Sequence, residues 1–166
     1  MRQNDTVRLG TVTEENWLEA ASLSVAEEQK GFVAPAIGIL ARGYVYRDCN
    51  ARVWTIEWNG QPAGLALVRE FTEEPLGYDL QQLMIDRRFQ RQGIGTAALR
   101  LILERLREEG HYGVVEVCVK KTDAAALRLY RNAGFADSGY VDPDAPDCVN
   151  LILSLNGMDK AGASNG

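Results

Sequence analysis

The chain has 166 residues, of which 46% are hydrophobic and 25% charged, and its formal net charge is −5 at pH 7. This length and balance are typical of one globular domain with a hydrophobic core, which we expect over residues 1–155. The acidic balance argues against a general nucleic-acid-binding protein, because such a protein needs a basic face that displaces the counterions of phosphates. A local basic patch could still bind a small anion.

The N-terminal sequence MRQNDTVRLG lacks an apolar segment of signal-peptide length, and the longest nearly apolar run, residues 32–41, is too short to span a bilayer. We therefore expect a cytoplasmic protein without a membrane partner. The three cysteines, Cys49, Cys118 and Cys148, are widely spaced, and His111 is the one histidine. This set makes no zinc pattern, so we expect no metal and interpret the cysteines as reduced, mostly buried thiols.

The first part of the chain predicts a strand over residues 6–12 followed by two helices. Thr13 is expected to cap the first helix, which runs towards Val25. Pro35 suits the first turn of the second helix, whose apolar residues fall at helical spacing. Those apolar residues are Ile37, Leu40, Ala41 and Tyr44.

The rest of the chain predicts strands broken by two further helices. Residues 53–71 predict a hairpin about the turn NGQP, and YDLQQLMID predicts a third strand that leads into a helix from Gly93 to Glu109. Residues 113–120 predict a strand buried on both faces, and Thr122 or Asp123 can cap a helix that ends at Asn132. FADSGYV and CVNLILSL predict two final strands, and residues 156–166 resemble a disordered tail.

This order, β-α-α-β-β-β-α-β-α-β-β, predicts a mixed α/β (α+β) fold. We expect a central twisted mixed sheet of about seven strands, flanked by about four helices.

The segment QRQGIGTAA, residues 90–98, lies at a predicted junction between a strand and a helix. A helix N-terminus presents unpaired backbone N–H groups and a positive dipole, and Gly93 and Gly95 remove side chains that would block an anion. Three arginines nearby add positive charge: Arg87, Arg88 and Arg91. From the glycines alone, a phosphate site and a tight turn with a solvated basic rim are both open.

A dinucleotide-binding motif is a third possibility, because GIGTAA fits G-x-G-x-x-A and Glu116 follows at about the spacing of a ribose-binding acid. However, Glu116 falls inside the next predicted strand, whereas a ribose hydroxyl would be met at its end. Too little chain follows for the further strand and helix pairs of that fold. We therefore disfavour this interpretation.

Two motifs together resemble the GNAT acetyltransferase superfamily. Residues 90–95 resemble its [R/Q]-x-x-G-x-[G/A] signature, and AAALRLYRNAGF, residues 124–135, resembles its second signature at the expected distance downstream. The resemblance covers roughly residues 6–155 and implies a GNAT-like fold. Within the superfamily, residues 15–34 and LMIDRRFQRQGIG are similar to bacterial spermine/spermidine N-acetyltransferases.

The resemblance implies acetyl-CoA as co-substrate and assigns roles to individual residues. Leu83, Met84 and Ile85 would offer strand backbone to the pantetheine amides. The residues implied to surround the pyrophosphate are Gln90, Arg91, Gln92, Gly93, Ile94, Gly95 and Thr96. Tyr130 matches the tyrosine that protonates the leaving thiolate, although such a residue can also be an ordinary core aromatic.

The sequence departs from the family pattern at two positions. Asp123 stands where many members have an asparagine that binds the pantetheine arm, and an ionised aspartate accepts but does not donate hydrogen bonds. Asp123 can instead be mainly a helix cap. Gln81 stands where many members have a glutamate base, so Gln81 is a tentative catalytic residue that cannot take a proton at neutral pH.

Acetyl transfer to an amine needs a proton acceptor and a site for a cation. Asp79, two residues before Gln81 on an alternating strand, is the best candidate base, directly or through water. Glu27, Glu28 and Phe32 are candidate substrate-binding residues. Further acidic and aromatic candidates are Glu70, Glu73, Glu74, Tyr44 and Trp54. Cys118 has no basic partner in its strand, so we do not expect a covalent acetyl-cysteine.

We therefore predict direct acetyl transfer to a primary amine, best matched by a polyamine such as spermidine or spermine. Another amine, such as an aminoglycoside, an amino acid or a protein N-terminus, is the alternative within the superfamily. Because the glutamate is missing, a catalytically degenerate acetyl-CoA sensor or interaction module is also open. The expected partner is a small-molecule amine, not nucleic acid or a membrane, and a homodimer is a further possibility.

Overall fold

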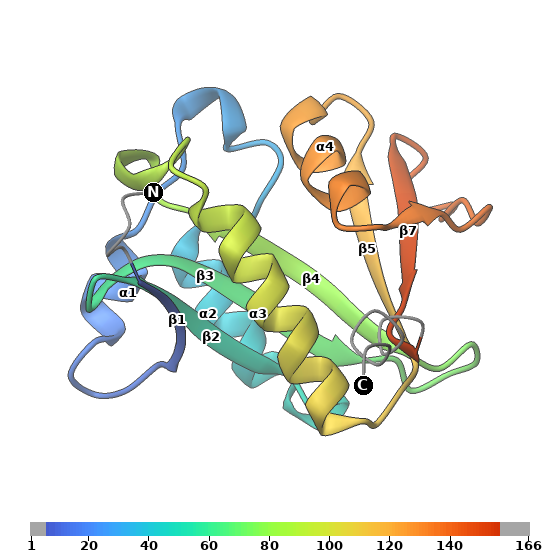
Figure 1. Ribbon diagram of the computed structural model, residues 1–166, viewed down its shortest axis with the longest axis horizontal. Helices are drawn as coiled ribbons and strands as arrows, with labels where there is room; N and C mark the ends of the chain where they lie inside the picture. Colours follow the sequence, from blue (N-terminus) through green and yellow to red (C-terminus); the bar gives the residue numbers. More distant parts are fainter. Residues whose placement is uncertain (1–5, 157–166) are drawn as a thin grey trace, which may run out of the picture.

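The structure, a computed structural model, describes residues 6–156, which form a seven-stranded mixed sheet with helices on both faces (Figure 1). The strands are β1 (Val7–Thr11), β2 (Arg52–Trp58), β3 (Gln61–Glu70), β4 (Tyr78–Ile85), β5 (Val114–Lys120), β6 (Ala136–Asp137) and β7 (Cys148–Ser154). The helices are α1 (Trp17–Ser22), α2 (Ala36–Val45), α3 (Ile94–Glu109) and α4 (Ala124–Asn132). The predicted order and fold class are confirmed.

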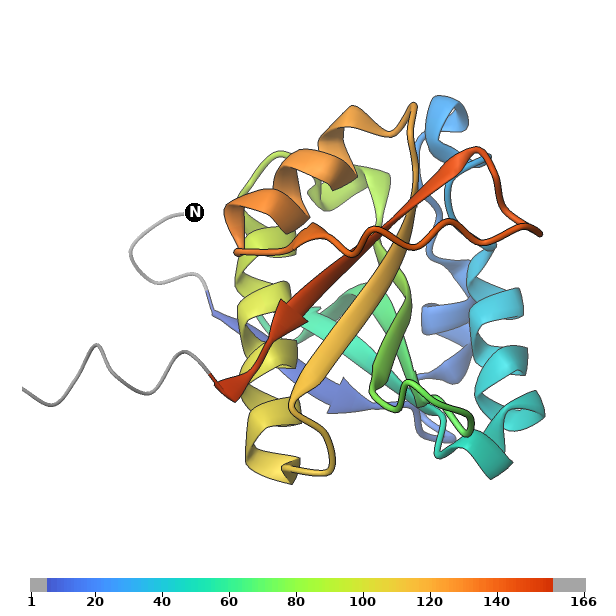
Figure 2. The ribbon, with the colours of Figure 1, turned by 90° about the vertical axis from the view of Figure 1, so that its right-hand side faces the viewer.

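The strands lie in the order β1-β2-β3-β4-β5-β7-β6. β4 and β5 are parallel, and the other neighbours are antiparallel. Figure 2 shows α3 and α4 on one face of the sheet and α1 and α2 on the other. Each face has its own buried cluster: Leu99 and Ile102 of α3 belong to the first, and Ile39 of α2 packs with Leu65 and Leu67 in the second. Burying each of these large side chains contributes about 1.5–3 kcal/mol.

Two predicted turns are confirmed by their backbone angles. Asn59 (φ 51°) and Gly60 (φ 83°) connect β2 to β3, and positive φ at both central residues is typical of a tight hairpin turn. Gly93 (φ 78°) precedes α3 and Gly110 (φ 67°) follows it, so this helix is bounded by glycines in the left-handed region. The predicted apolar stripe of α3 is buried.

The prediction for the first helix is wrong at both ends. Asn16, not Thr13, precedes α1, and the Thr13 backbone N–H donates to Asn16 Oδ1 at 2.7 Å. The helix ends at Ser22, because Leu23 is extended and lies buried in the same cluster as Val25. Tertiary burial of these two side chains therefore outweighs the helical pattern.

Three further predictions need correction. Most of the predicted apolar face of α2 is turned outward: Ile37 and Tyr44 are 55% and 71% exposed and Ala41 is exposed, whereas Leu40 packs on the core beside the buried Ala36 and Ile39. β5 is buried on one face only, because its alternate residues face the surface and a cavity. The strand predicted over residues 135–141 is reduced to β6, since the chain then turns away from β7.

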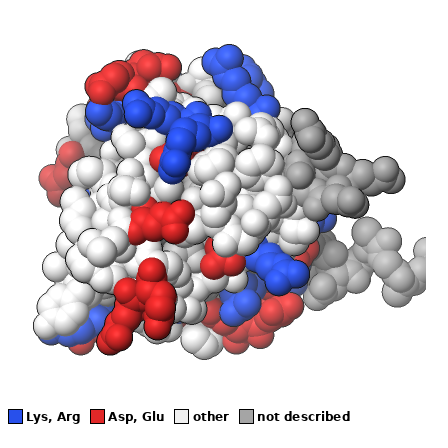
Figure 3. Space-filling model, turned by 90° about the vertical axis from the view of Figure 1, so that its left-hand side faces the viewer, with Lys and Arg blue, Asp and Glu red and all other residues white. Residues whose placement is uncertain are grey.

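No helix within residues 6–156 has both the length and the apolar character needed to cross a membrane. Figure 3 shows positive and negative side chains mixed over one face of the molecule, with Lys and Arg also gathered at its upper end. α3 begins at that upper end in Figure 1. Of the predicted C-terminal tail, residues 157–166 lie outside the described residues.

Candidate active site

β4 and β5 separate soon after they meet (Figure 1). A cavity of about 550 Å³ lies where they part. Only two residue pairs join them within the described chain: Tyr78 with Val115, and Asp79 with Glu116. The cavity is lined by β4, β5, α4, the start of α3 and the loop of residues 24–34 between α1 and α2. The gap gives a ligand access to the unpaired edge of β4.

The β4 wall contains Leu83, Met84 and Ile85, as predicted, and an irregularity at Gln81. Leu67 of β3 pairs with Gln82 and the next residue pairs with Leu80, so Gln81 is an extra residue in β4. The Gln81 Oε1 atom is buried and has no hydrogen-bond partner among the described residues. A donor from a ligand could satisfy it.

The start of α3 forms an open cradle at the cavity. Gly93, Ile94, Gly95 and Thr96 all line it, and no side chain caps the helix. A Cβ atom added to Gly93 would meet nothing within 4 Å, so the approach to the first backbone N–H groups is clear. Arg91 also lines the cavity and adds positive charge. This arrangement suits the phosphate groups of a ligand.

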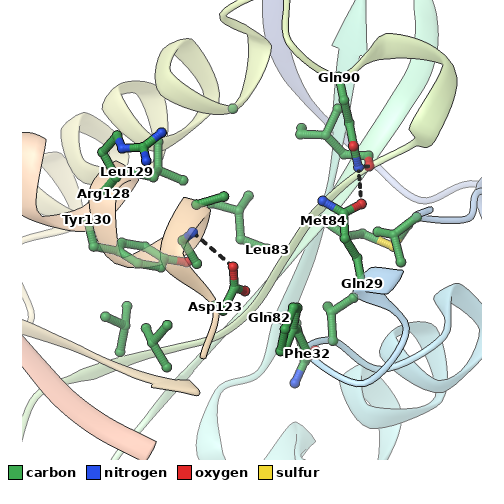
Figure 4. A pocket seen from close by; sticks show the side chains of 18 of the residues that line it. Gln29, Phe32, Gln82, Leu83, Met84, Gln90, Asp123, Arg128, Leu129 and Tyr130 are labelled. Carbon is green, nitrogen blue, oxygen red and sulfur yellow. Dashed lines mark hydrogen bonds between the residues drawn. The ribbon is translucent and has the colours of Figure 1, made fainter. Parts of the chain in front are cut away.

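Gln90 lines the cavity, but its side chain points into the protein (Figure 4). Its Nε2 atom donates to the Ile85 carbonyl oxygen at 2.9 Å and to Gln29 Oε1 at 2.8 Å. Of the residues predicted to surround a pyrophosphate, Gln92 is the one that does not line the cavity.

Tyr130 lies near the end of α4, 7% exposed, and its ring packs edge-on against Phe135 with 5.3 Å between centroids. Figure 4 shows this side chain reaching from α4 into the cavity. Burial, and secondarily the negative charge of Asp123, raises the pKa of Tyr130 above its ordinary value. The hydroxyl therefore keeps its proton over the physiological pH range. Asp123 was expected at the cofactor or, alternatively, as a helix cap; it lines the cavity and also caps α4, because its Oδ1 accepts from the Ala126 N–H at 3.1 Å.

The candidate base, Asp79, is 8% exposed and does not line the cavity. Its Oδ2 accepts from Arg69 Nε at 2.8 Å, and it lies opposite Glu116 where β4 and β5 separate. Burial raises the pKa of Asp79 despite the opposing hydrogen bond and charge of Arg69. Burial, followed by the charges of Asp79 and Asp142, also raises the pKa of Glu116.

Among the predicted substrate-binding residues, Glu28 and Phe32 line the cavity. Glu27 does not, and it forms an exposed ion pair with Lys30 instead. Both lining residues belong to loop 24–34, which forms one rim of the cavity.

Asp86, which the sequence analysis missed, joins loop 24–34 to the loop of residues 86–93 that precedes α3. Its buried carboxylate accepts from the Ser24 N–H (2.9 Å) and from the Arg88 backbone N–H (2.9 Å) and Nε (2.8 Å). Gln82 was also missed, and its Oε1 accepts from the Ala34 N–H at 2.9 Å. The contacts with Arg88 are local, but no local sequence signal identifies those with Ser24 and Ala34, because these partners lie 62 and 48 residues away.

Cys118 was expected to be an inert thiol in a buried strand, but it is exposed and lines the cavity. Cys148 is buried, as expected, and Cys49 is partly buried. Although the side chain is exposed at the cavity, partial desolvation by the surrounding residues, followed by the neighbouring Cys148, raises the pKa of Cys118 to about 12. The thiol therefore stays protonated at neutral pH, so the expected lack of reactivity follows from electrostatics although the expected burial was wrong.

One group of three potential metal ligands occurs among residues 6–156: Glu70, Glu109 and His111. It lies at the opposite end of α3 from the cavity. Arg52 bonds both carboxylates, at 3.4 Å to Glu70 and 2.6 Å to Glu109, and so already offsets part of their charge. This group therefore fits an ion-pair network better than a cation site.

Comparisons with known proteins agree with this geometry. The family model described as "Acetyltransferase (GNAT) family" matches residues 11–135. The rat protein N-acetyltransferase family 8 member 2 is 29% identical over 98 residues, which are 57% of this chain and 43% of the rat protein. The match thus spans less than half the length of that relative.

Solved acetyltransferases share the fold. The aminoglycoside acetyltransferase AAC(6')-Ib, in complex with coenzyme A, gives a TM-score of 0.71 at 18% identity and covers 91% of this chain and 95% of its own. The ribosomal-protein-S18-alanine N-acetyltransferase from Escherichia coli gives 0.65 at 20% identity, covering 91% and 94%. At these identities the likeness concerns the fold alone, but the family model covers most of the chain. The chain therefore belongs to the acetyltransferase (GNAT) family.

Proposed function

We propose that this protein transfers an acetyl group from acetyl-CoA to a primary amine. The observation that carries the proposal is the cavity between the parted strands β4 and β5, which ends at an uncapped, glycine-bounded helix N-terminus. This shape provides strand edge for an amide-containing arm and backbone N–H groups for phosphates. Family membership supports the same conclusion.

In this mechanism the amine nitrogen attacks the thioester carbonyl carbon, and the carbon–sulfur bond breaks. Tyr130 gives its proton to the departing CoA thiolate and is reprotonated from water. Its raised pKa keeps the phenol protonated and so available as a donor, but it also makes the phenol a weaker acid, so the role rests on the position of Tyr130 in the cavity. The cavity itself contributes by placing the two substrates together.

The amine must lose a proton, and we assign that proton to Asp79 through water. Support comes from the position of Asp79, next to the cavity-lining Leu80 and Gln81, and from its raised pKa. A base acts only when it is deprotonated, so kcat/KM should fall as the pH drops below the pKa of Asp79. Because this pKa is raised, the fall should occur closer to neutral pH.

Replacing Asp79 with asparagine should therefore lower kcat/KM about tenfold at pH 7 and remove the acidic limb of the pH profile. The check is kcat/KM from pH 5 to 9, with CoA affinity and unfolding measured beside it. Parallel profiles for the two proteins would exclude Asp79 as the base.

For the acceptor we propose a polyamine such as spermidine or spermine. Support comes from Glu28 and Phe32, which bring a carboxylate and an aromatic ring to the rim. Aminoglycosides and protein N-termini are the competing acceptors; the names of two proteins of the same fold include an aminoglycoside and an alanine of ribosomal protein S18. The test is CoA thiol release with acetyl-CoA and a panel of polyamines, aminoglycosides, amino acids and peptides.

A second candidate function is the binding of acetyl-CoA without turnover. Gln81 favours it because an amide stands where a base was expected, and Asp79 favours it because its carboxylate is already paired with Arg69. Saturable acetyl-CoA binding without thiol release on the whole panel would favour this candidate. Release with a polyamine but not with the other amines would support the first.

The cradle can be tested by replacing Gly93 with asparagine, a residue that tolerates positive φ. The side chain would project into the open space before α3, so we expect the dissociation constant of CoA to rise about tenfold. Gly110→Asn is the matched control, because it makes the same change at φ 67° at the other end of the helix. Equal CoA affinity in the two variants, measured by calorimetry, would contradict the cradle.

A further inference from the structure

Loop 24–34 is held to the rest of the protein at three points, and they differ in what they touch. Asp86 bonds the Ser24 N–H at one end, and Gln82 bonds the Ala34 N–H at the other. The middle of the loop is held by the contact between Gln29 and Gln90. The Ser24 end also contacts the start of loop 86–93, through Asp86 and through the Arg87 N–H, which donates to the Ser24 carbonyl oxygen at 2.9 Å. The central contact is the one of the three that involves Gln90, the first residue of the QRQGIG segment before α3.

The hydrogen bonds around this contact leave one orientation for both amides. Gln90 Nε2 uses its two hydrogens on Ile85 O and Gln29 Oε1. Gln29 Oε1 in turn accepts from Gln90 and from the Ala26 N–H at 3.1 Å. Since an amide nitrogen has two hydrogens and an amide oxygen two lone pairs, each atom is fully used. A shift of loop 24–34 would break the Gln29–Gln90 bond, and a shift of Gln90 would break this bond and the bond to the Ile85 carbonyl.

Gln90 is also close in sequence to the cradle. Arg91 follows it with φ 62°, an uncommon conformation for a residue with a side chain, and Gly93 follows at φ 78°. This segment is therefore narrowly constrained, and an anion bound at the start of α3 would reduce its motion further. Gln29 is flanked on the other side by Glu28 and lies near Phe32, both at the cavity rim.

We propose that Gln29 and Gln90 are positioning residues that couple CoA binding to the order of loop 24–34. Binding of CoA at the cradle fixes residues 90–93, the Gln29–Gln90 bond is held more firmly, and the rim becomes ready for the acceptor. By linkage, an acceptor that orders the rim strengthens CoA binding by the same factor. The inference rests on the proposed function, because it requires CoA at the cradle.

Hydrogen–deuterium exchange tests the coupling without knowing the acceptor. The probe is CoA, and the readout is the exchange of the Gln29, Lys30 and Phe32 amides, which are hydrogen-bonded within the loop. In the unmodified protein, saturating CoA should slow this exchange about fivefold, the factor expected when one hydrogen bond is secured. In Gln29→Met, which lacks the acceptor atom, CoA should still bind but the slowing should disappear.

Two further variants separate coupling from simple damage. Gln29→Glu keeps an oxygen that can accept from Gln90 and Ala26, so the response to CoA should be retained. Gln90→Met should lose the slowing of exchange by CoA. This variant also loses the bond to the Ile85 carbonyl, which can lower CoA affinity. In that case the result with Gln29→Met decides whether the coupling exists, because Gln29 makes no bond to the Ile85 carbonyl. Failure of the unmodified protein to bind CoA would refute the proposed function. Tight CoA binding with no slowing, or with equal slowing in Gln29→Met, would overturn the coupling.

Discussion

Replacing Tyr130 with phenylalanine should lower kcat about 100-fold, the usual contribution of a general acid, while the dissociation constant of CoA changes less than about twofold. The variant loses only the hydroxyl, and the ring can keep its edge-on contact with Phe135. The thiolate would then leave without a proton from the protein. Steady-state kinetics and calorimetric CoA binding measure the two parts of this prediction.

The matched control is Tyr44→Phe, the same change on the exposed side of α2. It should leave kcat unchanged. Because the pKa of Tyr130 is raised above its ordinary value, kcat should not fall through ionisation of this residue below about pH 10. An unchanged kcat in Tyr130→Phe would remove Tyr130 from the mechanism.

Replacing Asp86 with alanine should lower the free energy of unfolding by about 3 kcal/mol at pH 7, because the change leaves three donors of Ser24 and Arg88 without their carboxylate. Burial alone would raise the pKa of Asp86, but hydrogen bonds from Arg88 and Ser24 outweigh it, and the pKa is lowered overall. A lowered pKa stabilises the folded protein above the ordinary carboxyl pKa. This stabilisation is lost as the pH falls through the folded value.

The difference between the unmodified protein and Asp86→Ala should therefore narrow below about pH 4. Urea unfolding at pH 7 and pH 3 measures it. Asp48→Ala, a change at an exposed aspartate between α2 and β2, is the control and should stay within about 0.5 kcal/mol. A loss below about 1 kcal/mol at pH 7, or an equal loss at both pH values, would contradict the assigned role of Asp86.

Local sequence signals predicted the fold wherever the backbone itself needs a particular residue. Asn59 and Gly60 mark the hairpin and Gly93 marks the start of α3, because each adopts positive φ in the structure. The predictions failed where contacts with residues distant in the sequence determine which side chains are buried. Ile37 and Tyr44 fit a helical stripe, yet α2 packs on the sheet through Ala36 and Ile39.

The candidate site shows the same division. Each of the two family motifs has its own local structure, one at the start of α3 and one along α4. The residues that these motifs identified, those of the α3 cradle and Tyr130, line one cavity. The inward turn of Gln90 could not be predicted, since its partner Gln29 lies 61 residues away. The ion pair between Asp79 and Arg69 likewise depends on strand register and not on a sequence pattern.

The high pKa of Cys118 bears on a side reaction that any acyl-transfer cavity with a thiol must avoid. Because the pKa of Cys118 is raised well above its ordinary value, the side chain is almost entirely a neutral thiol at pH 8. A thioester held beside this residue would rarely be intercepted, so self-acetylation should be slow compared with transfer to an amine. Partial desolvation and the neighbouring Cys148 suppress the nucleophile at Cys118, and they thereby protect the acyl donor until an amine binds.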